Sequence, residues 1–286
     1  MKIVTDAAAD LPNDEVQELG VTVAPLYIQF PEGEVSSTDL TPDQFYDRLE
    51  AMQPNIPTTA QPSAGVFDGI YKAAALPDEE ILSIHISSGL SGTINAAIQA
   101  AKNYAGRVAV FDSMTLSGGE RFQVLAAAKA ARAGWSRAAI QERLEAIRAS
   151  TEVIYTLETL TYLARGGRIG RVQALAGSLL GLKPIIDVDK ADGKYSTIGK
   201  TRTLPRALQT IGDHLATLYP QDTPVWVSVM HGRFSDQANN LSGLLKERLN
   251  AAHLEVLRIS PVLGVHTGPG IVGAAVVPMR WMEDLE

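Results

Sequence analysis

Short apolar segments alternate with amphipathic helical segments through the first half of the chain, and this alternation constrains the fold more than any other feature. A typical helical segment is 118–133, in which apolar residues recur at helical spacing and Gly134 follows the last turn. The segments with the composition of strands are 2–5, 20–30, 80–86 and 107–112. Alternating strands and helices of this kind predict an α/β fold with a mostly parallel, doubly wound sheet.

The second half of the chain predicts a different sheet. Asp192-Gly193 separates the apolar segments 184–188 and 195–200, and this dipeptide is typical of a tight turn between antiparallel strands. A hairpin among further strands and helices predicts a mixed sheet. A helix is also expected over 172–180.

The length of the chain predicts its domain organisation. With 286 residues, and roughly 150 residues per domain, two domains are expected. The parallel pattern gives way to the mixed pattern near residue 150. We therefore expect an N-terminal α/β domain over 1–150 and a C-terminal α/β domain over 151–286.

Composition excludes several functional classes. The chain has no cysteine, which excludes a disulfide scaffold, a zinc–thiolate site and a cysteine nucleophile. It also has no His-Glu-x-x-His, EF-hand, Walker A or dinucleotide-binding motif, so we expect no metal and no cofactor. The formal charge of −7 argues against nucleic-acid binding. No signal sequence and no run of about 18 apolar residues is present, so a cytoplasmic protein is expected.

The net charge is unevenly distributed along the sequence. Residues 1–80 carry 3 basic and 15 acidic groups, whereas residues 161–206 carry 9 basic and 3 acidic groups. The basic segment is either a solvated face or a docking surface for an anionic partner. In the second case, we expect Arg165, Arg168 and Arg171 to contribute to docking.

Three polar loops are predicted to lead into helices, at 58–63, 87–93 and 112–119. Ligands of parallel sheets bind outside the carboxyl ends of the strands. Short hydroxyl side chains and backbone N–H groups at helix N-termini suit an anion such as a carboxylate or a phosphate. Ordinary helix capping explains any one loop alone, but three together favour a ligand site.

A fourth loop is predicted over 264–270, where three glycines surround His266. Glycines at these positions would let the backbone approach a ligand closely. We therefore expect His266 to take part in polar chemistry. By contrast, His85 lies within an apolar strand segment and is expected to be a satisfied core residue.

A serine hydrolase is the alternative function. Gly89-Leu90-Ser91-Gly92 falls at a strand-to-helix turn, which is where a nucleophile elbow lies. Asp112 and His266 follow in the chain order Ser–Asp–His, which is the order in α/β-hydrolases. The elbow pattern needs a second glycine at position 93, however, and this chain has Thr93 there.

An ordered set of motifs resembles the DegV family of bacterial fatty-acid-binding proteins, almost from end to end. The motifs are Thr5-Asp6 with Ala9-Asp10-Leu11-Pro12, Pro57-Thr58-Thr59 with Gln61-Pro62-Ser63, Ile86 to Thr93, Leu160 with Leu163, Gly166-Gly167-Arg168-Ile169, Lys183-Pro184-Ile185-Ile186, and Gly264 with His266 and Gly268-Pro269-Gly270. Each motif alone is unspecific, but the ordered set is specific.

The resemblance implies two α/β domains with a long-chain fatty acid buried between them. It implies that the hydroxyls of Thr59 and Ser91 hold the carboxylate, beside Gly92, with His266 nearby and Arg168 close to the head group. The secondary candidates are Thr93, Asp6, Gln61, Ser63 and Ser117. Candidate walls for the acyl chain are 24–30, 160–163 and 172–180, although each of these segments could equally be simple core.

The resemblance also implies partners. Such proteins are not enzymes alone: they present the bound acid to a fatty-acid kinase subunit, which forms an acyl phosphate for phospholipid synthesis. Separately, the basic segment predicts docking on this subunit or transient contact with an anionic membrane surface. A third alternative is a relation to dihydroxyacetone kinases, with dihydroxyacetone attached covalently to a histidine. This chain has Ala7 and Ala60 where the family usually has serine, and each difference removes one hydroxyl near the expected head group.

Overall fold

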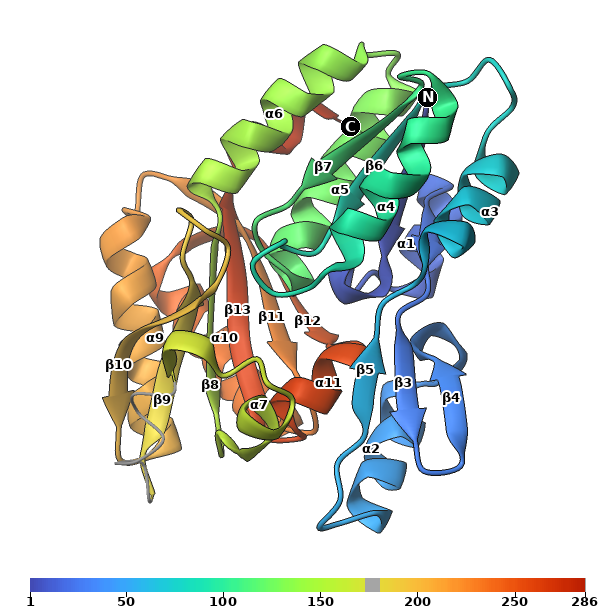
Figure 1. Ribbon diagram of the computed structural model, residues 1–286. Helices are drawn as coiled ribbons and strands as arrows, with labels where there is room; N and C mark the ends of the chain where they lie inside the picture. The colour runs from blue at the N-terminus through green and yellow to red at the C-terminus, as the bar shows by residue number, and fades with distance from the viewer. Residues whose placement is uncertain (173–180, 286) are drawn as a thin grey trace.

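The computed structural model describes residues 1–172 and 181–285 of the chain (Figure 1). Its N-terminal half contains a sheet in which every neighbouring pair of strands is parallel, in the order β2-β1-β6-β7. The strands are β1 (Lys2–Asp6), β2 (Thr22–Ala24), β6 (Ile81–His85) and β7 (Val108–Asp112). The parallel sheet predicted from the alternation is therefore confirmed.

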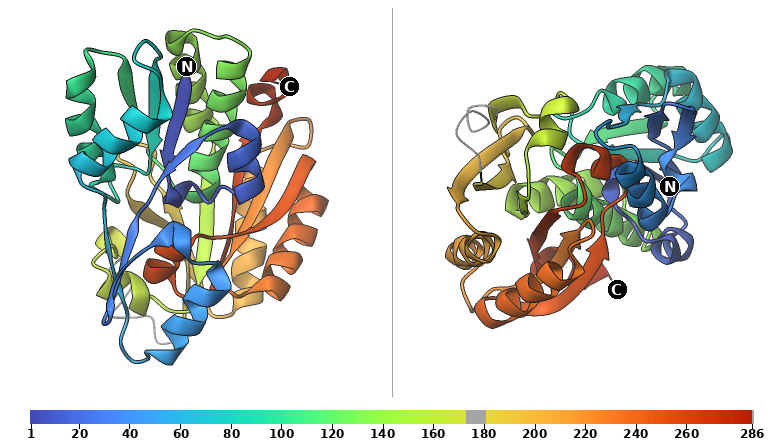
Figure 2. Two further views of the ribbon diagram at one scale, coloured as in Figure 1. Left: turned by 90° about the vertical axis from the view of Figure 1, so that its right-hand side faces the viewer. Right: turned by 90° about the horizontal axis from the view of Figure 1, so that it is seen from below.

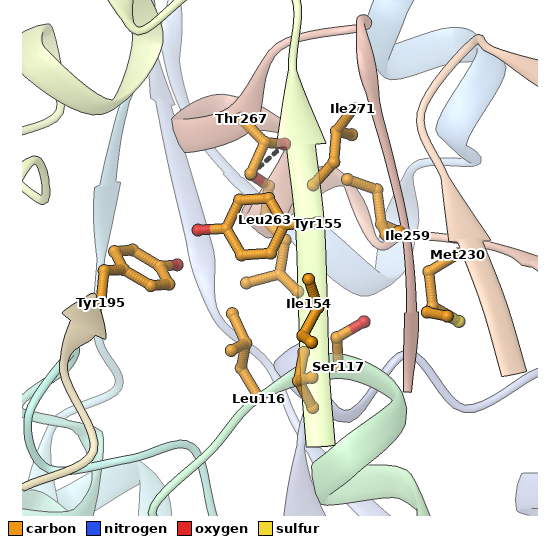
Figure 3. A pocket seen from close by; sticks show the side chains of 13 residues that line it. Leu116, Ser117, Ile154, Tyr155, Tyr195, Met230, Ile259, Leu263, Thr267 and Ile271 are labelled. Carbon is orange, nitrogen blue, oxygen red and sulfur yellow. Dashed lines mark hydrogen bonds between the residues drawn. The ribbon is translucent and has the colours of Figure 1, made fainter. Parts of the chain in front are cut away.

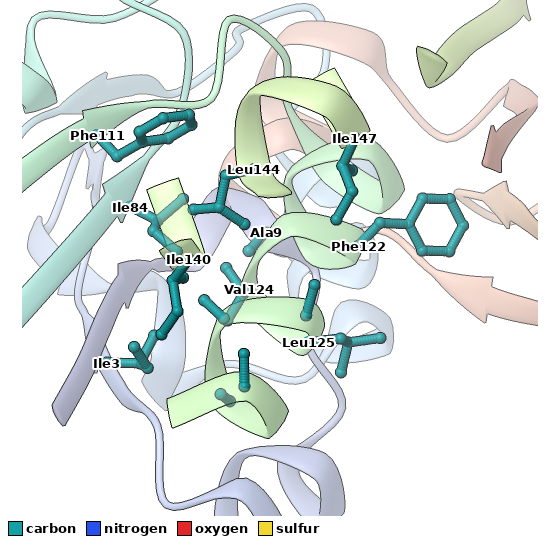
Figure 4. Close-up of a cluster of buried hydrophobic side chains, with 14 of the residues drawn as sticks. Ile3, Ala9, Ile84, Phe111, Phe122, Val124, Leu125, Ile140, Leu144 and Ile147 are labelled. Carbon is teal, nitrogen blue, oxygen red and sulfur yellow. The ribbon is translucent and has the colours of Figure 1, made fainter. Parts of the chain in front are cut away.

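Helices cover both faces of this sheet, because its strands carry apolar side chains on both sides. Val4 and Ile81 pack on one face against α3 and α4. Ile3, Leu82 and Ile84 pack on the other face against α5 and α6 (Figure 4). The helices around this sheet are α1 (Asn13–Leu19), α3 (Ala64–Ala74), α4 (Thr93–Ala101), α5 (Ser117–Arg132) and α6 (Arg137–Ser150).

The second sheet has the order β10-β9-β8-β13-β11-β12, and among these strands only β11 and β12 are parallel. The strands are β8 (Glu152–Leu157), β9 (Lys183–Val188), β10 (Tyr195–Thr201), β11 (Pro224–His231), β12 (Asn250–Arg258) and β13 (Ile271–Pro278). Asp192-Gly193 lies in the turn that joins antiparallel β9 and β10, so both the hairpin and the mixed sheet are confirmed. Helices α9 (Leu204–Leu218) and α10 (Ser235–Arg248) cover the outer face of this sheet (Figure 2).

Helix α5 joins the two halves because it lies between the two large sheets. It packs against β1 on one side and against β13 on the other (Figure 2). A Cβ atom added at Gly118 would lie 2.7 Å from the Cβ of Ala275, so only glycine lets α5 approach β13 this closely. A helix that is buried on nearly all sides is typical of such an interior position.

A third, antiparallel sheet was not expected. It has the order β4-β3-β5 and consists of β3 (Tyr27–Phe30), β4 (Gly33–Ser36) and β5 (Thr58–Ala60), with α2 (Pro42–Ala51) packed on it. The single strand predicted over 20–30 is wrong, since β2 and β3 belong to different sheets. Pro25 lies between them and cannot donate a backbone hydrogen bond. The loop predicted over 58–63 is also wrong in part, because residues 58–60 form β5.

The loop predicted over 264–270 is wrong in part, because only residues 268–270 lie outside helices and strands. Residues Pro261–Thr267 form helix α11, whose first turn begins with a proline, as is common at this position. All seven of its residues are buried, and it packs against α2 and α7 (Thr161–Arg165). The helix predicted over 172–180 falls outside the described residues except for Val172, which ends a 3₁₀ turn.

The remaining short elements are 3₁₀ turns. Their bounds are Ala7–Ala9 for η1, Ser37–Asp39 for η2, Lys102–Tyr104 for η3, Gly170–Val172 for η4, Met279–Trp281 for η5 and Glu283–Leu285 for η6. In the part of the chain that the structure describes, no helix is both long and apolar enough to cross a membrane.

Candidate ligand-binding site

A polar pocket gathers side chains from segments that lie far apart in the sequence. Its lining residues are Leu26, Thr59, Ala60, Gln61, Ile86, Leu90, Ser91, Arg168, Tyr195, Val262, Leu263 and His266. Thr59 comes from β5, Ser91 precedes α4, and His266 lies on the last turn of α11. The structure therefore brings together Thr59, Ser91, His266 and Arg168, the four side chains expected around a head group.

Thr59 and His266 form the polar centre of this pocket. The distance between Thr59 Oγ1 and His266 Nε2 is 2.9 Å. His266 is only 8 % exposed, and its Nδ1 atom has no hydrogen-bond partner among the described residues. Burial, together with the positive charge of Arg168, lowers the pKa of His266 to about 4. The imidazole is therefore neutral at pH 7.

A glycine accounts for the position of the His266 ring. A Cβ atom added at Gly166 would lie 2.3 Å from His266 Nδ1, so a larger residue there would displace the imidazole. The neighbouring Arg168 is exposed, and its Nη1 donates a hydrogen bond of 2.8 Å to the carbonyl oxygen of Gly166. The segment 166–168 thus contacts the histidine and carries a positive charge at the pocket.

The loop before α4 holds Ser91 in a fixed position. Ser91 Oγ accepts a hydrogen bond of 3.2 Å from the backbone N–H of Thr93 and lies 2.8 Å from Thr93 Oγ1. Thr93 itself is buried and supports Ser91. The Gln61 side chain lies so close to Gly92 that a Cβ atom there would be 2.2 Å from Gln61 Oε1. Gln61, Ser91 and Gly92 therefore meet at one wall of the pocket.

An apolar cavity, shown in Figure 3, lies next to the polar pocket, and Tyr195 and Leu263 line both. It is lined by Leu116, Ser117, Val153, Ile154, Tyr155, Tyr195, Met230, Ile259, Leu263, Thr267, Ile271, Gly273 and Ala274. The Tyr155 and Tyr195 rings meet edge to face, with their centroids 5.8 Å apart. Most of the lining is aliphatic, so the cavity offers apolar contacts. Its open volume is about 30 Å³, so a long acyl chain would have to displace some of the lining side chains.

Three secondary candidates have structural roles outside the polar pocket. Ser63 caps α3 by accepting a hydrogen bond of 3.3 Å from the N–H of Val66, which is the ordinary role considered above. Ser117 lines the apolar cavity, and its hydroxyl donates to Asp10 over 2.5 Å. Asp6 lies in a separate buried cluster with His85.

This buried cluster has the connectivity of a catalytic triad. Ser83 Oγ lies 2.7 Å from His85 Nε2, and His85 Nδ1 lies 2.9 Å from Asp6 Oδ2. All three side chains are 0–1 % exposed. Tyr71 also donates to Ser83 Oγ, and the backbone N–H groups of Ala8 and Ile86 donate to Asp6. The expectation that His85 is a satisfied core residue is confirmed.

The predicted hydrolase triad is not formed. His266 Nε2 contacts Thr59 rather than Ser91, and no carboxylate contacts His266 Nδ1 among the described residues. Asp112 instead accepts hydrogen bonds from the backbone N–H groups of Ser88 and Met114. The hydrolase alternative therefore lacks both the general base and the group that would orient it.

The three arginines of the basic segment have different surroundings. Arg171 forms ion pairs with Asp189 and Asp192, which offset its charge. Arg165 donates to the carbonyl oxygen of Pro54. Arg168 is the one of the three that lines the polar pocket.

The two departures from the family pattern lie in different places. Ala60 lines the polar pocket, so a serine at this position would place a hydroxyl at the pocket. Ala7 begins the turn η1 and packs against an apolar cluster of the interior.

Sequence reasoning missed the apolar cavity. Among the proposed wall segments, Leu26 lines the polar pocket, whereas the cavity itself is built mainly from β8, β13 and α11. Tyr155 and Gly273 are neighbours on paired strands, although 118 positions separate them in the sequence. The apolar runs identified these strands but carried no signal of which strands pair.

The chain thus combines a two-sheet α/β fold with a polar pocket and a neighbouring apolar cavity. The sequence model described as "Uncharacterised protein, DegV family" matches residues 1–279. The chain is 38 % identical over 285 residues to a DegV domain-containing protein of Deinococcus radiodurans, covering 98 % of this chain and 96 % of that protein. This chain therefore belongs to the DegV family.

Solved structures of the family share the fold. A DegV family protein from Thermus thermophilus, described for its fatty-acid binding, superposes with a TM-score of 0.91 at 32 % identity, covering 97 % of this chain and 99 % of that one. DegV from Bacillus subtilis, described as a fatty-acid-binding protein, gives a TM-score of 0.87 at 27 % identity, covering 97 % and 98 %. A stearic-acid-binding protein from Eubacterium ventriosum gives 0.88 at 25 % identity, covering 99 % of each chain.

Proposed function

We propose that this chain binds a long-chain fatty acid, with the carboxylate in the polar pocket and the acyl chain in the apolar cavity. The observation that carries the proposal is the Thr59–His266 contact beside an apolar cavity, with Tyr195 and Leu263 common to both. The fatty acids bound by family members of known structure support the same ligand class.

The neutral His266 prepares the Thr59 hydroxyl to donate to a carboxylate. When Nε2 carries the imidazole proton, Thr59 Oγ1 accepts it and its own proton remains available for the ligand. In the same way, Ser91 can accept from Thr93 and donate outward. Two hydroxyl donors, with the positive charge of Arg168 at the pocket, compensate the cost of burying a carboxylate.

The acyl chain supplies most of the affinity. Burial of each methylene contributes about 0.8 kcal/mol, so a chain of roughly 14 methylenes gains on the order of 11 kcal/mol before the costs of binding. The head group then fixes the orientation of the ligand. Affinity and orientation therefore come from two different parts of the site.

Displacement of a fluorescent fatty acid by palmitate tests the binding proposal. We expect Thr59→Val to weaken palmitate binding about 10- to 100-fold, because it leaves the carboxylate and His266 without a hydroxyl partner. Thr58→Val is the matched control, since Thr58 is exposed on the same strand and does not line the pocket. Equal affinities of the two variants would contradict the assignment of Thr59.

We further propose that the bound carboxylate is presented to a fatty-acid kinase subunit. Support comes from Arg168, which is exposed and lines the polar pocket, so a carboxylate bound in this pocket would lie close to the surface. Contact with the partner, and transiently with anionic lipid, is assigned to the basic segment 161–206. Reconstitution with a kinase subunit, ATP and palmitate should yield an acyl phosphate that hydroxylamine traps, and Arg168→Glu should lower its rate. An acyl phosphate formed equally fast without this chain would contradict the role.

A further inference from the structure

A groove on another part of the molecule has no role in the proposed lipid site. Its volume is about 890 Å³, within the usual range for binding sites, and it shares only Ile259 with the apolar cavity. It is bordered by residues 6–7, 10–13, 16, 21–23 and 37–42 of the N-terminal half and by 256–261 of the C-terminal half. Both large sheets therefore contribute to it.

Each large sheet ends at this groove with a strand that is paired on one side only. Among the described strands, β2 pairs only with β1, and β12 pairs only with β11. The groove is lined by 21–23, around β2, and by 256–258 at the end of β12. An open sheet edge offers backbone N–H and C=O groups to a further strand. Val256 of β12 is 37 % exposed and adds an apolar contact.

The groove also carries uncompensated negative charge. Arg258 lines it but already pairs with Asp43. Asp39 is exposed and has no ion-pair partner in the described part of the chain. Asp10 is 6 % exposed. Among the described residues it accepts hydrogen bonds only from Ser117 Oγ, over 2.5 Å, and from the backbone N–H of Ser260, over 2.7 Å. A cationic group that enters the groove would supply the positive charge and the further hydrogen-bond donors that Asp10 and Asp39 lack.

A buried hydroxyl faces the groove without a partner. Ser37 is 3 % exposed, and its Oγ atom makes no hydrogen bond within residues 1–172 and 181–285. Leaving such a group unsatisfied costs about 1–3 kcal/mol, which a ligand that supplies a donor or an acceptor would recover. The peptide backbone supplies both.

We propose that this groove binds an extended, basic peptide segment of a partner protein. The segment pairs with the open edge of β12 and places a lysine or arginine side chain against Asp10 and Asp39. The two open strand edges favour a peptide over a small polyamine, since only a peptide can continue the sheet. This site is separate from the fatty-acid site and does not depend on it.

A fluorescein-labelled hexapeptide with the sequence Val-Lys-Val-Lys-Val-Lys is the probe, followed by fluorescence anisotropy. We expect saturable binding, and at least about tenfold weaker binding of a peptide in which the second and third valines are proline, because proline cannot complete the ladder. The corresponding glutamate peptide should not bind. Equal binding of the valine and proline peptides would overturn the pairing with β12. So would displacement of the labelled valine peptide by spermidine at the same concentration of positive charge.

Two lysine substitutions at exposed apolar positions locate the site. Val256→Lys places a positive charge in the groove and should weaken peptide binding about tenfold or more. Leu218→Lys is the matched control on α9, where the side chain is 44 % exposed, and should leave peptide binding unchanged. Both variants should keep the thermal midpoint and the palmitate affinity of the parent chain. Equal peptide affinities of the two variants, or no binding to the parent chain at millimolar peptide, would overturn the proposal.

Discussion

Two histidines of this chain show how little a side-chain constellation reveals about function on its own. His85 has the neighbours of a catalytic histidine, with Ser83 on one ring nitrogen and Asp6 on the other. His266 has only Thr59 on one nitrogen and nothing on the other among the described residues. Yet His85 is fully buried in a satisfied network, whereas His266 lines a pocket.

The difference lies in access and in unused hydrogen-bonding capacity. Every polar atom of the Asp6 carboxylate is occupied by His85 or by backbone N–H groups, so the cluster has nothing to offer a ligand. The hydroxyl of Thr59 can still donate a proton outward. We infer that the His85 cluster stabilises the parallel sheet and that the His266 pocket binds ligand, and the following predictions test this division.

The largest effect is expected from the His85 cluster. Asp6→Ala leaves three buried donors without an acceptor, namely His85 Nδ1 and the backbone N–H groups of Ala8 and Ile86. We expect the free energy of unfolding, measured with urea, to fall by about 3–5 kcal/mol. The folded fraction should bind palmitate as the parent chain does. A loss of less than about 1 kcal/mol would contradict a stabilising role for the cluster.

A pH effect of similar size is expected from His266 in the free protein. Its pKa is lowered in the folded state to about 4, below the ordinary value of 6.5. The unfolded chain therefore binds the proton more readily, and stability is lost as the pH falls from 6.5 toward 4. The loss is about 3 kcal/mol, at 1.36 kcal/mol per pKa unit. Urea unfolding at a series of pH values should show this slope in the parent chain and a flatter one in His266→Gln.

Smaller effects are expected from alanine substitution of two serines, one of which should lower stability and the other palmitate affinity. Ser83→Ala should lower the free energy of unfolding by about 1–2 kcal/mol and leave palmitate affinity unchanged, because Ser83 bridges Tyr71 and His85 away from the pocket. Ser91→Ala should do the reverse and weaken palmitate binding about tenfold at nearly constant stability. If both substitutions lowered stability and neither changed palmitate affinity, the assignment of Ser91 to the head-group site would be contradicted.

The smallest effect is expected for covalent labelling of the two serines. A fluorophosphonate probe should label neither Ser83, which no solvent reaches, nor Ser91, which has no histidine partner. Mass spectrometry of the treated chain should show no added mass. Labelling of Ser91 would restore the hydrolase alternative.

Local patterns predicted the elements, whereas the site depends on contacts between distant segments. The parallel and mixed sheets followed from alternation and from Asp192-Gly193, which are features of short stretches of sequence. The Thr59–His266 contact spans 207 positions, and no periodicity reveals it. The glycines around His266 suggested a loop, but Pro261 starts a helix there and the buried packing of α11 stabilises it.

The family motifs identified site residues that the periodicity of the sequence could not identify. They named Thr59, Ser91, His266 and Arg168 together, and the structure places all four around one pocket. They carried no information on the apolar cavity, because its walls are ordinary core residues of β8 and β13. Such residues become a cavity only through the way the strands and α11 pack.

Analysis of lipid that copurifies with the chain tests the central claim most directly. Purified protein is denatured and extracted, and the extract is quantified by mass spectrometry against the protein concentration. The account predicts close to one long-chain fatty acid per chain, and less in Thr59→Val than in Thr58→Val. Absence of fatty acid from the parent chain, together with no uptake of added palmitate after delipidation, would contradict it.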